Sequence, residues 1–455
     1  MDAKVKPAPN SPEARDIAYH MHPSVDLKRY EDEGGLIIEK GKGIYVYDNA
    51  GNKYIEGLAG LWSVAVGFDE ERLADVAYQQ MRKLPYYHNF NYKAVGPAVD
   101  LAEKLVEISP EHIKKVHFTS SGSEANDLIV KMIWYRSNAL NKPEKKKIIG
   151  RKKAYHGVTI AAGSVTGLAP NHTSFDLPLD RMIHTETPDY PRDHLEGETE
   201  EQFSARMAQA LEDLILAEGP ETIAAMFGEP VMGAGGVIVP PKGYWDGIQA
   251  VLKKYDILLV ADEVICGFGR TGKMFACETY GIKPDVITTS KQLSSSYMPL
   301  SAILMSQEFY APIAEESHRL GVFGHGFTAS GHPVATAVGL ENVKIIEERD
   351  LVGNAARMEK PFLARLKKLE DHGQTLWSRG VGLIGAIELK PGEKPGLMGP
   401  KAQAHLLKQG VICRAIGDAL CFCPPLIITE EQINVMFDAV ERALDDLAAE
   451  LAEEA

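Results

Sequence analysis

The feature that most constrains the fold is a series of short apolar segments in the middle of the chain. The strand candidates are Lys115–Thr119, Ile148–Gly150, Ile223–Phe227, Ile257–Ala261, Asp285–Thr288 and Ser301–Met305. Between them, Gln202–Leu216 and Tyr244–Tyr255 have the apolar spacing of amphipathic helices. Strands that alternate with helices are typical of parallel sheets, because a parallel connection needs a long crossover. The sequence therefore predicts an α/β fold with a largely parallel sheet covered on both faces.

The two ends of the chain predict a smaller second unit. Beyond about Gly339, long helices over Asn342–Leu369 and Glu430–Glu453 bracket short strands at Gly382–Leu389 and Gly410–Arg414. Near the N-terminus, residues 43–47 and the segment after the turn at 48–52 have the pattern of two strands, and a few short strands need a partner to bury a face. We predict residues 1–63 as the N-terminal part of a small α+β domain, residues 64–328 as the large domain, and residues 329–455 as the rest of the small domain.

Composition excludes several classes of protein. The chain has 455 residues, 25% of them charged, and a formal net charge of −14. Nucleic acid is therefore a poor partner, and the only basic run, Lys142 to Lys153, has the pattern of a solvated loop. No apolar run reaches the ~18–20 residues of a membrane span and the N-terminus lacks a signal core, which predicts a cytoplasmic protein with no membrane contact. The 5 cysteines have no zinc spacing, so we predict reduced thiols and no metal site.

Three ionisable residues stand at or just beyond the ends of strand candidates: Glu229, Asp262 and Lys291. Their separations are close to the ~30 residues of one βαβ unit, which places a glutamate, an aspartate and a lysine on one rim of the sheet. An aspartate at the end of so apolar a strand needs a cationic partner, either a structural Lys or Arg or a protonated heterocycle. A partly buried lysine has a lowered pKa, and is either an amine nucleophile or a salt-bridge partner.

Two further segments suit a ligand that carries phosphate. Ser121, Gly122 and Ser123 stand where a strand ends and a helix begins. The backbone N–H groups and the dipole of a helix start bind phosphate, although the same residues also suit a plain N-cap. Tyr155 and His156 follow the strand candidate at Ile148, where an aromatic ring either stacks on a planar ligand or belongs to the core.

Gly267–Gly272 matches GxGxxG, but we predict that it does not bind a dinucleotide. Asp262 to Cys266 separate it from the strand, no helix-like run follows, and no acid lies ~20 residues further on. The sequence has no GxxxxGKS/T, HExxH or GxSxG, so the P-loop, zincin and α/β-hydrolase classes lack their motifs.

A phosphate-binding helix start, a strand-end aspartate and a strand-end lysine are together what pyridoxal phosphate requires. The helix start holds the phosphate. Asp262 keeps the pyridine nitrogen protonated, so that the ring can accept electrons. Lys291 forms a Schiff base and, once displaced, moves a proton. The residues therefore predict an enzyme that uses pyridoxal phosphate.

In these residues the chain resembles the class III (ω-) aminotransferases, which are fold-type I pyridoxal-phosphate enzymes. The resemblance runs from about Asp26 to the C-terminus and is carried by Thr119–Ala125, Tyr155–Gly157, Gly228–Pro230, Ala261–Val264, Thr289–Lys291 and Phe327–Pro333. It implies a large domain with a mostly parallel seven-stranded sheet and a smaller α+β domain. It also implies a homodimer, or a tetramer built from such dimers, with shared active sites.

The resemblance also implies a role for each matching residue. The cofactor would be bound by Ser121, Gly122, Ser123, Tyr155, His156, Glu229, Asp262, Val264, Lys291 and Thr328. Lys291 and Asp262 would be catalytic, Val264 would pack under the ring, and Tyr155 would stack on it. Thr328 would reach the phosphate in the neighbouring subunit.

Within the class, the likeness is to (S)-selective amine:pyruvate ω-transaminases. Leu58–Trp62 matches their pocket wall, with Trp62 toward the substrate, and Val411–Asp418 matches the segment that bears their mobile arginine. Arg414 would bind the carboxylate of pyruvate bidentately and swing away from a bulky amine, unless it is only a surface charge. Phe90, Tyr92 and Tyr155 would also line the pocket. The implied activity is a ping-pong transfer of an amino group from a primary amine to pyruvate or another keto acid.

Three alternatives share these motifs. A β-alanine, taurine, γ-aminobutyrate or polyamine aminotransferase has the same cofactor residues, and donor profiling separates these. A pyridoxal-phosphate decarboxylase or aminomutase would lose no motif. A cofactor-binding scaffold without catalysis is the third, and the presence of both Lys291 and Asp262 argues against it.

Overall fold

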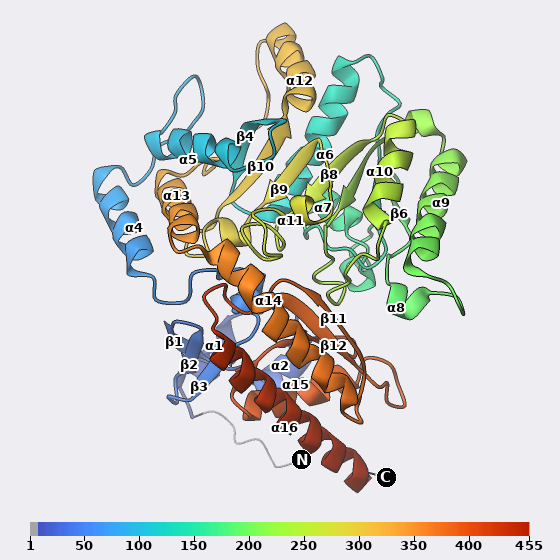
Figure 1. Ribbon diagram of the computed structural model, residues 1–455. Coiled ribbons are helices and arrows are strands. Elements are labelled where there is room, and N and C mark those ends of the chain that lie inside the picture. Colours follow the sequence, from blue (N-terminus) through green and yellow to red (C-terminus); the bar gives the residue numbers. More distant parts are fainter. Residues whose placement is uncertain (1–7, 455) are drawn as a thin grey trace.

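A computed structural model describes residues 8–454 (Figure 1). The start of the expected proline-rich tail, residues 1–7, lies outside the described residues. The chain forms a larger α/β part around one sheet and a smaller part that contains both ends of the described chain (Figure 1). No helix in the described range is long and apolar enough to cross a membrane. All five cysteines are free and buried.

The larger part is built on a seven-stranded sheet of order β4-β10-β9-β8-β7-β5-β6. Its strands are β4 (Ile113–Thr119), β5 (Lys147–Arg151), β6 (Met182–Thr185), β7 (Ile223–Gly228), β8 (Leu258–Asp262), β9 (Val286–Thr289) and β10 (Ser301–Ser306). All pairs are parallel except the two that β10 makes with β4 and β9. The predicted largely parallel sheet is confirmed. The short edge strand β6 was not among the strand candidates, since its four residues include a histidine and a threonine and form no apolar run.

Helices cover both faces of this sheet, and the strands alternate between two apolar clusters accordingly. On β10, Ala302 and Leu304 belong to the cluster with α5, α9, α10 and α13, whereas Ile303 and Met305 belong to the cluster with α6 and α12. The helices of this part are α4 (Glu71–Lys83), α5 (Gly96–Glu107), α6 (Gly122–Ala139), α7 (Ile160–Val165), α8 (Tyr190–Asp193), α9 (Glu200–Glu218), α10 (Tyr244–Lys254), α11 (Ala276–Thr279), α12 (Gln307–Leu320) and α13 (Pro333–Glu348).

The smaller part contains two four-stranded sheets. One has the order β1-β2-β3-β13, from β1 (Ile38–Lys42), β2 (Tyr45–Asp48), β3 (Lys53–Glu56) and β13 (Val411–Ile412). The other has the order β11-β12-β15-β14, from β11 (Thr375–Val381), β12 (Ile384–Leu389), β14 (Arg414–Ile416) and β15 (Ala419–Phe422). Since β13 pairs in parallel with β3, the N-terminal strands do join a C-terminal strand, as expected. The domain boundaries at 63/64 and 328/329 stay a prediction.

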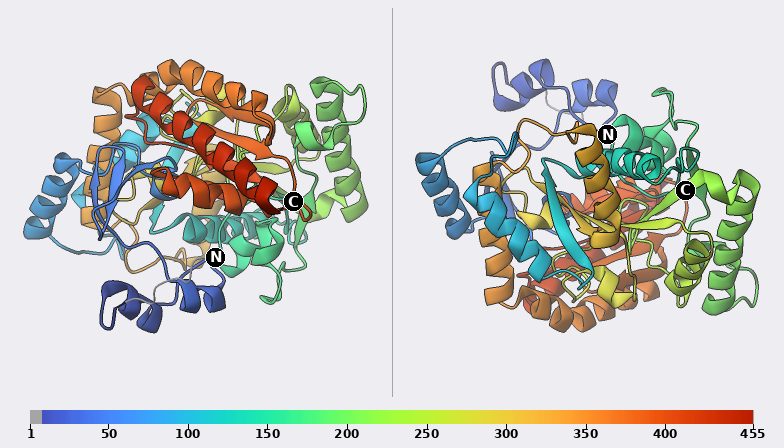
Figure 2. Two further views of the ribbon diagram at one scale, coloured as in Figure 1. Left: turned by 90° about the horizontal axis from the view of Figure 1, so that it is seen from below. Right: turned by 90° about the horizontal axis from the view of Figure 1, so that it is seen from above.

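The helices of the smaller part lie mainly on its outer side. They are α1 (Pro12–Tyr19), α2 (Leu27–Glu33), α3 (Ala59–Trp62), α14 (Leu351–Lys368), α15 (Met398–Lys408) and α16 (Glu430–Glu454). In both views of Figure 2, α1 and α2, in dark blue, stand out from the rest of the molecule. They are held to each other by Asp16, whose carboxylate accepts hydrogen bonds from Tyr30 and is bonded to His22.

Two expected elements of the C-terminal part are wrong. The single helix over Asn342–Leu369 is two helices, because Asp350 adopts a left-handed backbone (φ 50°) and its carboxylate caps α14 by accepting from the Gly353 N–H at 3.2 Å. The single strand over Gly410–Arg414 is also two strands. The chain leaves one sheet after Ile412 and enters the other at Arg414, so that the two sheets share this short segment.

The GxGxxG segment is an irregular loop with no helix start, consistent with its dismissal as a dinucleotide site. Its Arg270 is fully buried and donates to the carbonyl oxygens of Leu383 (2.9 Å) and Pro424 (2.6 Å) in the C-terminal part. The same guanidinium reaches the amide oxygen of Gln292, next to Lys291. Arg270 therefore joins the two parts of the molecule directly behind the strand-end lysine.

We expect Arg270→Ala to destabilise the protein by about 3 kcal/mol, since the buried carbonyl groups lose a charged donor. The thermal midpoint should fall by about 3 °C, because the unfolding entropy of a chain this long is large. Arg357→Ala, which removes an exposed arginine from α14, is the matched control and should shift the midpoint by less than about 1 °C. Equal midpoints for the two variants would contradict a joining role for Arg270.

Candidate active site

The three ionisable residues predicted on one rim do meet at one edge of the sheet. Asp262 is the last residue of β8, Glu229 directly follows β7, and Lys291 lies two residues beyond β9. These three strands are adjacent and parallel, so their carboxyl ends lie side by side. In open α/β sheets this edge is where ligands bind.

Asp262 is buried and held by neutral donors and a histidine. Its Oδ2 lies 2.9 Å from His156 Nδ1 and accepts from the Asn126 side-chain amide at 2.9 Å, and its Oδ1 accepts from the Val264 N–H at 3.1 Å. No lysine or arginine of the described chain forms an ion pair with it. The structural cation that would have explained a buried aspartate is therefore not present within residues 8–454.

Asn126 is a site residue that the sequence reasoning missed. It lies one turn into α6, is 1% exposed, and donates to both Asp262 and the carbonyl oxygen of His156, the latter at 2.7 Å. Its own amide oxygen accepts from the Thr288 hydroxyl at 2.7 Å, which fixes the amide orientation. The available signal was an amide at the fifth position of a helix whose other buried residues are apolar except for Ser137.

Lys291 stands in a constrained turn with a free amine. It begins a 3₁₀ turn with a left-handed backbone (φ 43°), and Asn342 anchors this turn by donating to the carbonyl oxygens of Gln292 (2.7 Å) and Leu293 (3.1 Å). Its Nζ makes no hydrogen bond or ion pair within the described range. Burial lowers the pKa of Lys291, and the nearby carboxylates of Asp262 and Glu229 oppose that shift only in part. Lys291 is therefore not a salt-bridge partner of any described residue.

Glu229 connects the sheet edge to the Tyr155 segment. Its buried carboxyl accepts from the Tyr155 N–H (3.1 Å) and the Gly233 N–H (3.0 Å), and burial raises its pKa. Its carbonyl oxygen accepts from Arg151 Nη2 at 2.6 Å. The interpretation of the Lys142–Lys153 run as a solvated loop is wrong for Arg151. This residue ends β5, is fully buried, and stacks its guanidinium over Trp245 at 5.2 Å.

The start of α6 lies beside these residues. Ser121 is a true N-cap that accepts from the Glu124 N–H at 3.2 Å, so the capping interpretation holds. Gly122 faces Val264, since a Cβ on Gly122 would lie 3.3 Å from a Val264 methyl carbon. The hydroxyl of Ser123 accepts from the Val158 N–H at 3.2 Å, which ties the helix start to the segment that bears Tyr155 and His156.

Arg414 and Trp62 approach the site from the smaller part. Arg414, on β14, forms no hydrogen bond or ion pair with any described residue. Its charge reaches Tyr155, where it partly offsets the rise that burial causes in the pKa of that phenol. Trp62 is only 2% exposed and packs in a cluster with Val231, against which Ile416 also packs. Trp62 thus borders the strand of Arg414 but is covered by neighbouring side chains.

Two predicted residues lie apart from this cluster. Thr328 is exposed, and its carbonyl oxygen accepts from the Tyr86 hydroxyl at 2.9 Å. Phe90 is 39% exposed and lies against Gly326, where an added Cβ would be 2.6 Å from its ring. Within the described chain, no hydrogen bond joins either residue to Lys291 or to the α6 start. They form instead a separate exposed patch, the 84–92 loop with the 326–328 segment.

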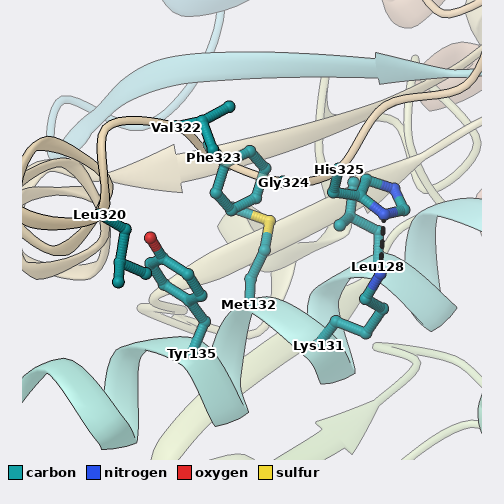
Figure 3. A pocket seen from close by; sticks show the side chains of 9 residues that line it. All are labelled: Leu128, Lys131, Met132, Tyr135, Leu320, Val322, Phe323, Gly324 and His325. Atoms are coloured by element: carbon teal, nitrogen blue, oxygen red, sulfur yellow. Dashed lines mark hydrogen bonds between the residues drawn. The ribbon is translucent and has the colours of Figure 1, made fainter.

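A further pocket of about 270 Å³ lies between α6 and the segment that follows α12 (Figure 3). Its lining is mostly apolar, and Lys131 is bonded to His325 at its edge, Nζ to Nδ1, at 2.9 Å (Figure 3). None of the predicted site residues lines it, so it is separate from the sheet-edge cluster.

Comparison with known protein families agrees with this site, which consists of a buried strand-end aspartate, a free strand-end lysine and a helix start. The family described as aminotransferase class-III covers residues 28–444. The chain is a class-III aminotransferase. Enzymes of this class depend on pyridoxal phosphate and have the fold-type I architecture, in agreement with the predicted fold class and cofactor.

Named relatives of this class-III aminotransferase include plant enzymes. It is 49% identical over 421 residues to "Gamma aminobutyrate transaminase 1, mitochondrial" of Solanum lycopersicum. The aligned region covers 91% of this chain and 82% of that protein. It is 46% identical over 419 residues to vanillin aminotransferase of Capsicum frutescens, covering 90% and 91% of the two chains.

Solved structures of transaminases superimpose on the class-III aminotransferase closely. The ω-transaminase from Pseudomonas jessenii in complex with PMP has a TM-score of 0.95 and 52% identity, covering 96% of this chain and 98% of that one. A structure described as a transaminase with L-Ala has a TM-score of 0.91 and 59% identity, covering 91% and 100%.

The residues of the class-III aminotransferase fit this cofactor. A buried carboxylate with no lysine or arginine partner suits the nitrogen of a protonated pyridine ring, and an amine with no partner suits attachment to an aldehyde. Gly122 has no side chain at the start of α6, where a Cβ would lie 3.3 Å from Val264, so the helix start is open to the close approach that a phosphate needs.

We expect Asn126→Ala to weaken cofactor binding about tenfold, because Asp262 loses a buried donor worth roughly 1–2 kcal/mol. The measurement is titration of the apoenzyme with pyridoxal phosphate. Thr288→Val keeps the Asn126 amide but frees its orientation, and should give a smaller loss. An Asn126→Ala variant that binds the cofactor with wild-type affinity would contradict the assignment of Asn126 to the site.

Proposed function

We propose that this class-III aminotransferase is an ω-transaminase that moves an amino group from a primary amine to pyruvate or another keto acid. The observation that carries the proposal is the unpartnered guanidinium of Arg414 beside Tyr155. A free arginine at the site can bind the carboxylate of a keto acid, and nothing in the described chain holds it there when an amine without a carboxylate enters. The solved relatives named ω-transaminase and transaminase with L-Ala support the same choice.

The second candidate is γ-aminobutyrate transamination. Several plant relatives at 46–49% identity carry that name, and γ-aminobutyrate also presents an amine at one end and a carboxylate at the other. In that case Arg414 would bind the carboxylate of the donor as well as that of the acceptor. The two candidates therefore differ in which donors the enzyme accepts.

When bound, pyridoxal phosphate supplies an electron-accepting ring that acidifies the α-carbon of the attached substrate. We assign its ring nitrogen to Asp262, which His156 and Asn126 orient. Val264 and Tyr155 would cover the two faces of the ring, and Glu229 fixes the Tyr155 backbone from behind. Ser121, Gly122 and Ser123 would hold the phosphate at the positive end of α6.

Lys291 has two tasks in this proposal. Its Nζ would hold the cofactor through the carbonyl carbon in the resting enzyme, until a donor amine takes its place. The freed neutral Nζ would then take a proton from the α-carbon of the substrate and return the same proton to that cofactor carbon, on the same face. Burial favours both tasks, since the lowered pKa increases the fraction of neutral amine that can accept a proton.

We also propose a homodimer with shared active sites. Phe90 and Thr328 are exposed together in one patch and remain apart from the Lys291 cluster of their own chain. In a dimer they would complete the partner's site, Thr328 at the phosphate and Phe90 at the substrate. A solution mass of about twice 49.9 kDa is expected from light scattering.

The cellular compartment stays a prediction. The cytoplasm is our proposal, whereas tomato relatives carry the words mitochondrial and chloroplastic in their names. Fractionation of the source cells would decide between these locations.

The first test is spectroscopic. We expect the absorbance band of the bound cofactor to collapse when an (S)-arylalkylamine is added and to return with pyruvate, because the amino group is first taken up and then passed on. Lys291→Ala should retain at most a few per cent of wild-type turnover. A band that is unchanged by the arylalkylamine but collapses on addition of γ-aminobutyrate would favour the second candidate.

The second test concerns Arg414. We expect Arg414→Ala to raise KM for pyruvate by about 30-fold or more, because a charged bidentate contact is lost, while KM for the arylalkylamine changes by less than about threefold. Arg414→Lys keeps the charge without the bidentate geometry and should fall between wild type and alanine. Equal effects on both substrates would remove the mobile-arginine role.

A further inference from the structure

A strained turn, Leu58–Trp62, follows β3 and is the segment that the sequence predicts as the pocket wall. Three of its residues have left-handed backbones: Ala59 (φ 52°), Gly60 (φ 68°) and Trp62 (φ 63°). For residues with a Cβ this conformation costs about 1–2 kcal/mol each, so a fixed contact must hold the turn in place.

The contact that holds the turn is the side chain of Glu56, the last residue of β3. Its Oε2 accepts from the Gly60 N–H, in the middle of the turn. Its backbone is fixed in turn, since the Glu56 N–H donates to the Ile44 carbonyl oxygen at 2.9 Å. Glu56 is 4% exposed, and its other oxygen, Oε1, has no partner among the described residues.

The segment after Glu56 is bonded to the strand end at Cys423. The Cys423 N–H donates to the Gly57 carbonyl oxygen at 2.7 Å, and both Glu56 and Lys291 act electrostatically on the pKa of the Cys423 thiol. Beyond the turn, the Ala65 N–H donates to the Ser295 hydroxyl at 3.1 Å, which lies on the same loop as Lys291. Glu56 therefore supports a turn that is anchored at both ends to the Lys291 region.

We propose that Glu56 is a positioning residue that sets amine selectivity, because its carboxyl group holds the Leu58–Trp62 turn and thereby the orientation of Trp62 in the pocket wall. This inference rests on the proposed ω-transaminase function and on the expected place of Trp62 in the wall of its amine pocket. Without the Glu56 contact the turn relaxes from its left-handed backbone, Trp62 moves, and the wall no longer fits a bulky donor.

The position of Glu56 also makes the contact sensitive to pH. Burial raises the pKa of Glu56 to about 8, with the backbone of Leu58 opposing the rise. The titratable groups that face it are the thiols of Cys413 and Cys423, and no charged residue of the described chain forms an ion pair with it. Near neutral pH the side chain is a neutral acid, and above about 8 its ionised oxygen needs water that the closed turn excludes.

Linkage gives the sign of the stability effect. Because the folded-state pKa of Glu56 exceeds the usual value of 4.5, its contribution to stability is present below 4.5 and is lost as the pH rises through about 8. Glu56→Gln cannot ionise. The thermal midpoint of the wild type should therefore fall relative to that of Glu56→Gln as the pH rises from 5 to about 9.

The decisive experiment compares Glu56→Ala with Glu56→Gln in the holoenzyme. For Glu56→Ala we expect KM for the arylalkylamine to rise about tenfold, with kcat and KM for L-alanine within about twofold, as the loss of one buried hydrogen bond predicts. Glu56→Gln keeps an acceptor for the Gly60 N–H and should restore wild-type KM. Asp48→Ala removes a buried carboxylate that holds the 48–52 turn of the same sheet, and should leave the selectivity unchanged.

Hydrogen exchange gives a readout that does not depend on activity. Backbone amides of residues 57–64 should exchange faster in Glu56→Ala than in wild type or Glu56→Gln, because the Gly60 N–H loses its partner. Unchanged exchange there would overturn the inference even if the arylalkylamine proved not to be a substrate. If Glu56→Ala fails to fold, Glu56→Asp decides: its shorter side chain withdraws the carboxyl group from the Gly60 N–H, so KM for the arylalkylamine should rise, and a wild-type KM together with wild-type exchange in this variant would overturn the proposal.

Discussion

The buried carboxyl group of Asp262 is the constraint around which the rest of the site is arranged. A carboxylate at the end of the central strand β8 costs several kcal/mol to desolvate unless donors surround it. The protein provides neutral donors and a histidine rather than an arginine or a lysine, which leaves the negative charge available to a bound cation. The positions of Asn126, His156 and Val264 follow from this requirement, and through them so do the start of α6 and the loop after β5.

The same edge of the sheet contains two more buried acids, and their treatment differs from that of Asp262. The carboxyl oxygens of Glu229 accept from the N–H groups of Tyr155 and Gly233. Those of Glu263 accept from the N–H groups of Ala276 and Cys277. Burial raises the pKa of Glu263 to about 7. Both acids therefore organise backbone, whereas Asp262 is left facing the site. Burial raises the pKa of both Glu229 and Glu263, which reduces the charge repulsion among three neighbouring carboxyl groups.

The smaller part is fused to this edge rather than loosely attached. Arg270 binds carbonyl groups of the C-terminal part, Arg379 donates to Gly236 and Val237 of the larger part, and Arg192 pairs with the buried Glu388 at 2.6 Å. These contacts bring Arg414 beside Tyr155 and set the Leu58–Trp62 turn behind the pocket. A substrate site built from both parts needs such cross-links, because a displacement of one part would separate the groups that bind the substrate from the groups that hold the cofactor.

The sequence by itself determined the residue types at the strand ends. Strands and amphipathic helices are periodic, so Glu229, Asp262 and Lys291 could be placed on one rim, and the α/β fold, the cofactor and the family followed from local patterns. Only the tertiary structure decided which groups meet across long separations: that Arg151 is buried under Trp245, that Asn126 completes the Asp262 cluster, that Glu56 holds Gly60, and that the chain breaks its helix at Asp350 and changes sheets after Ile412. Periodicity records which face of an element is apolar. It does not record which distant donor will be close enough to satisfy a buried charge, because that depends on how all the elements pack together.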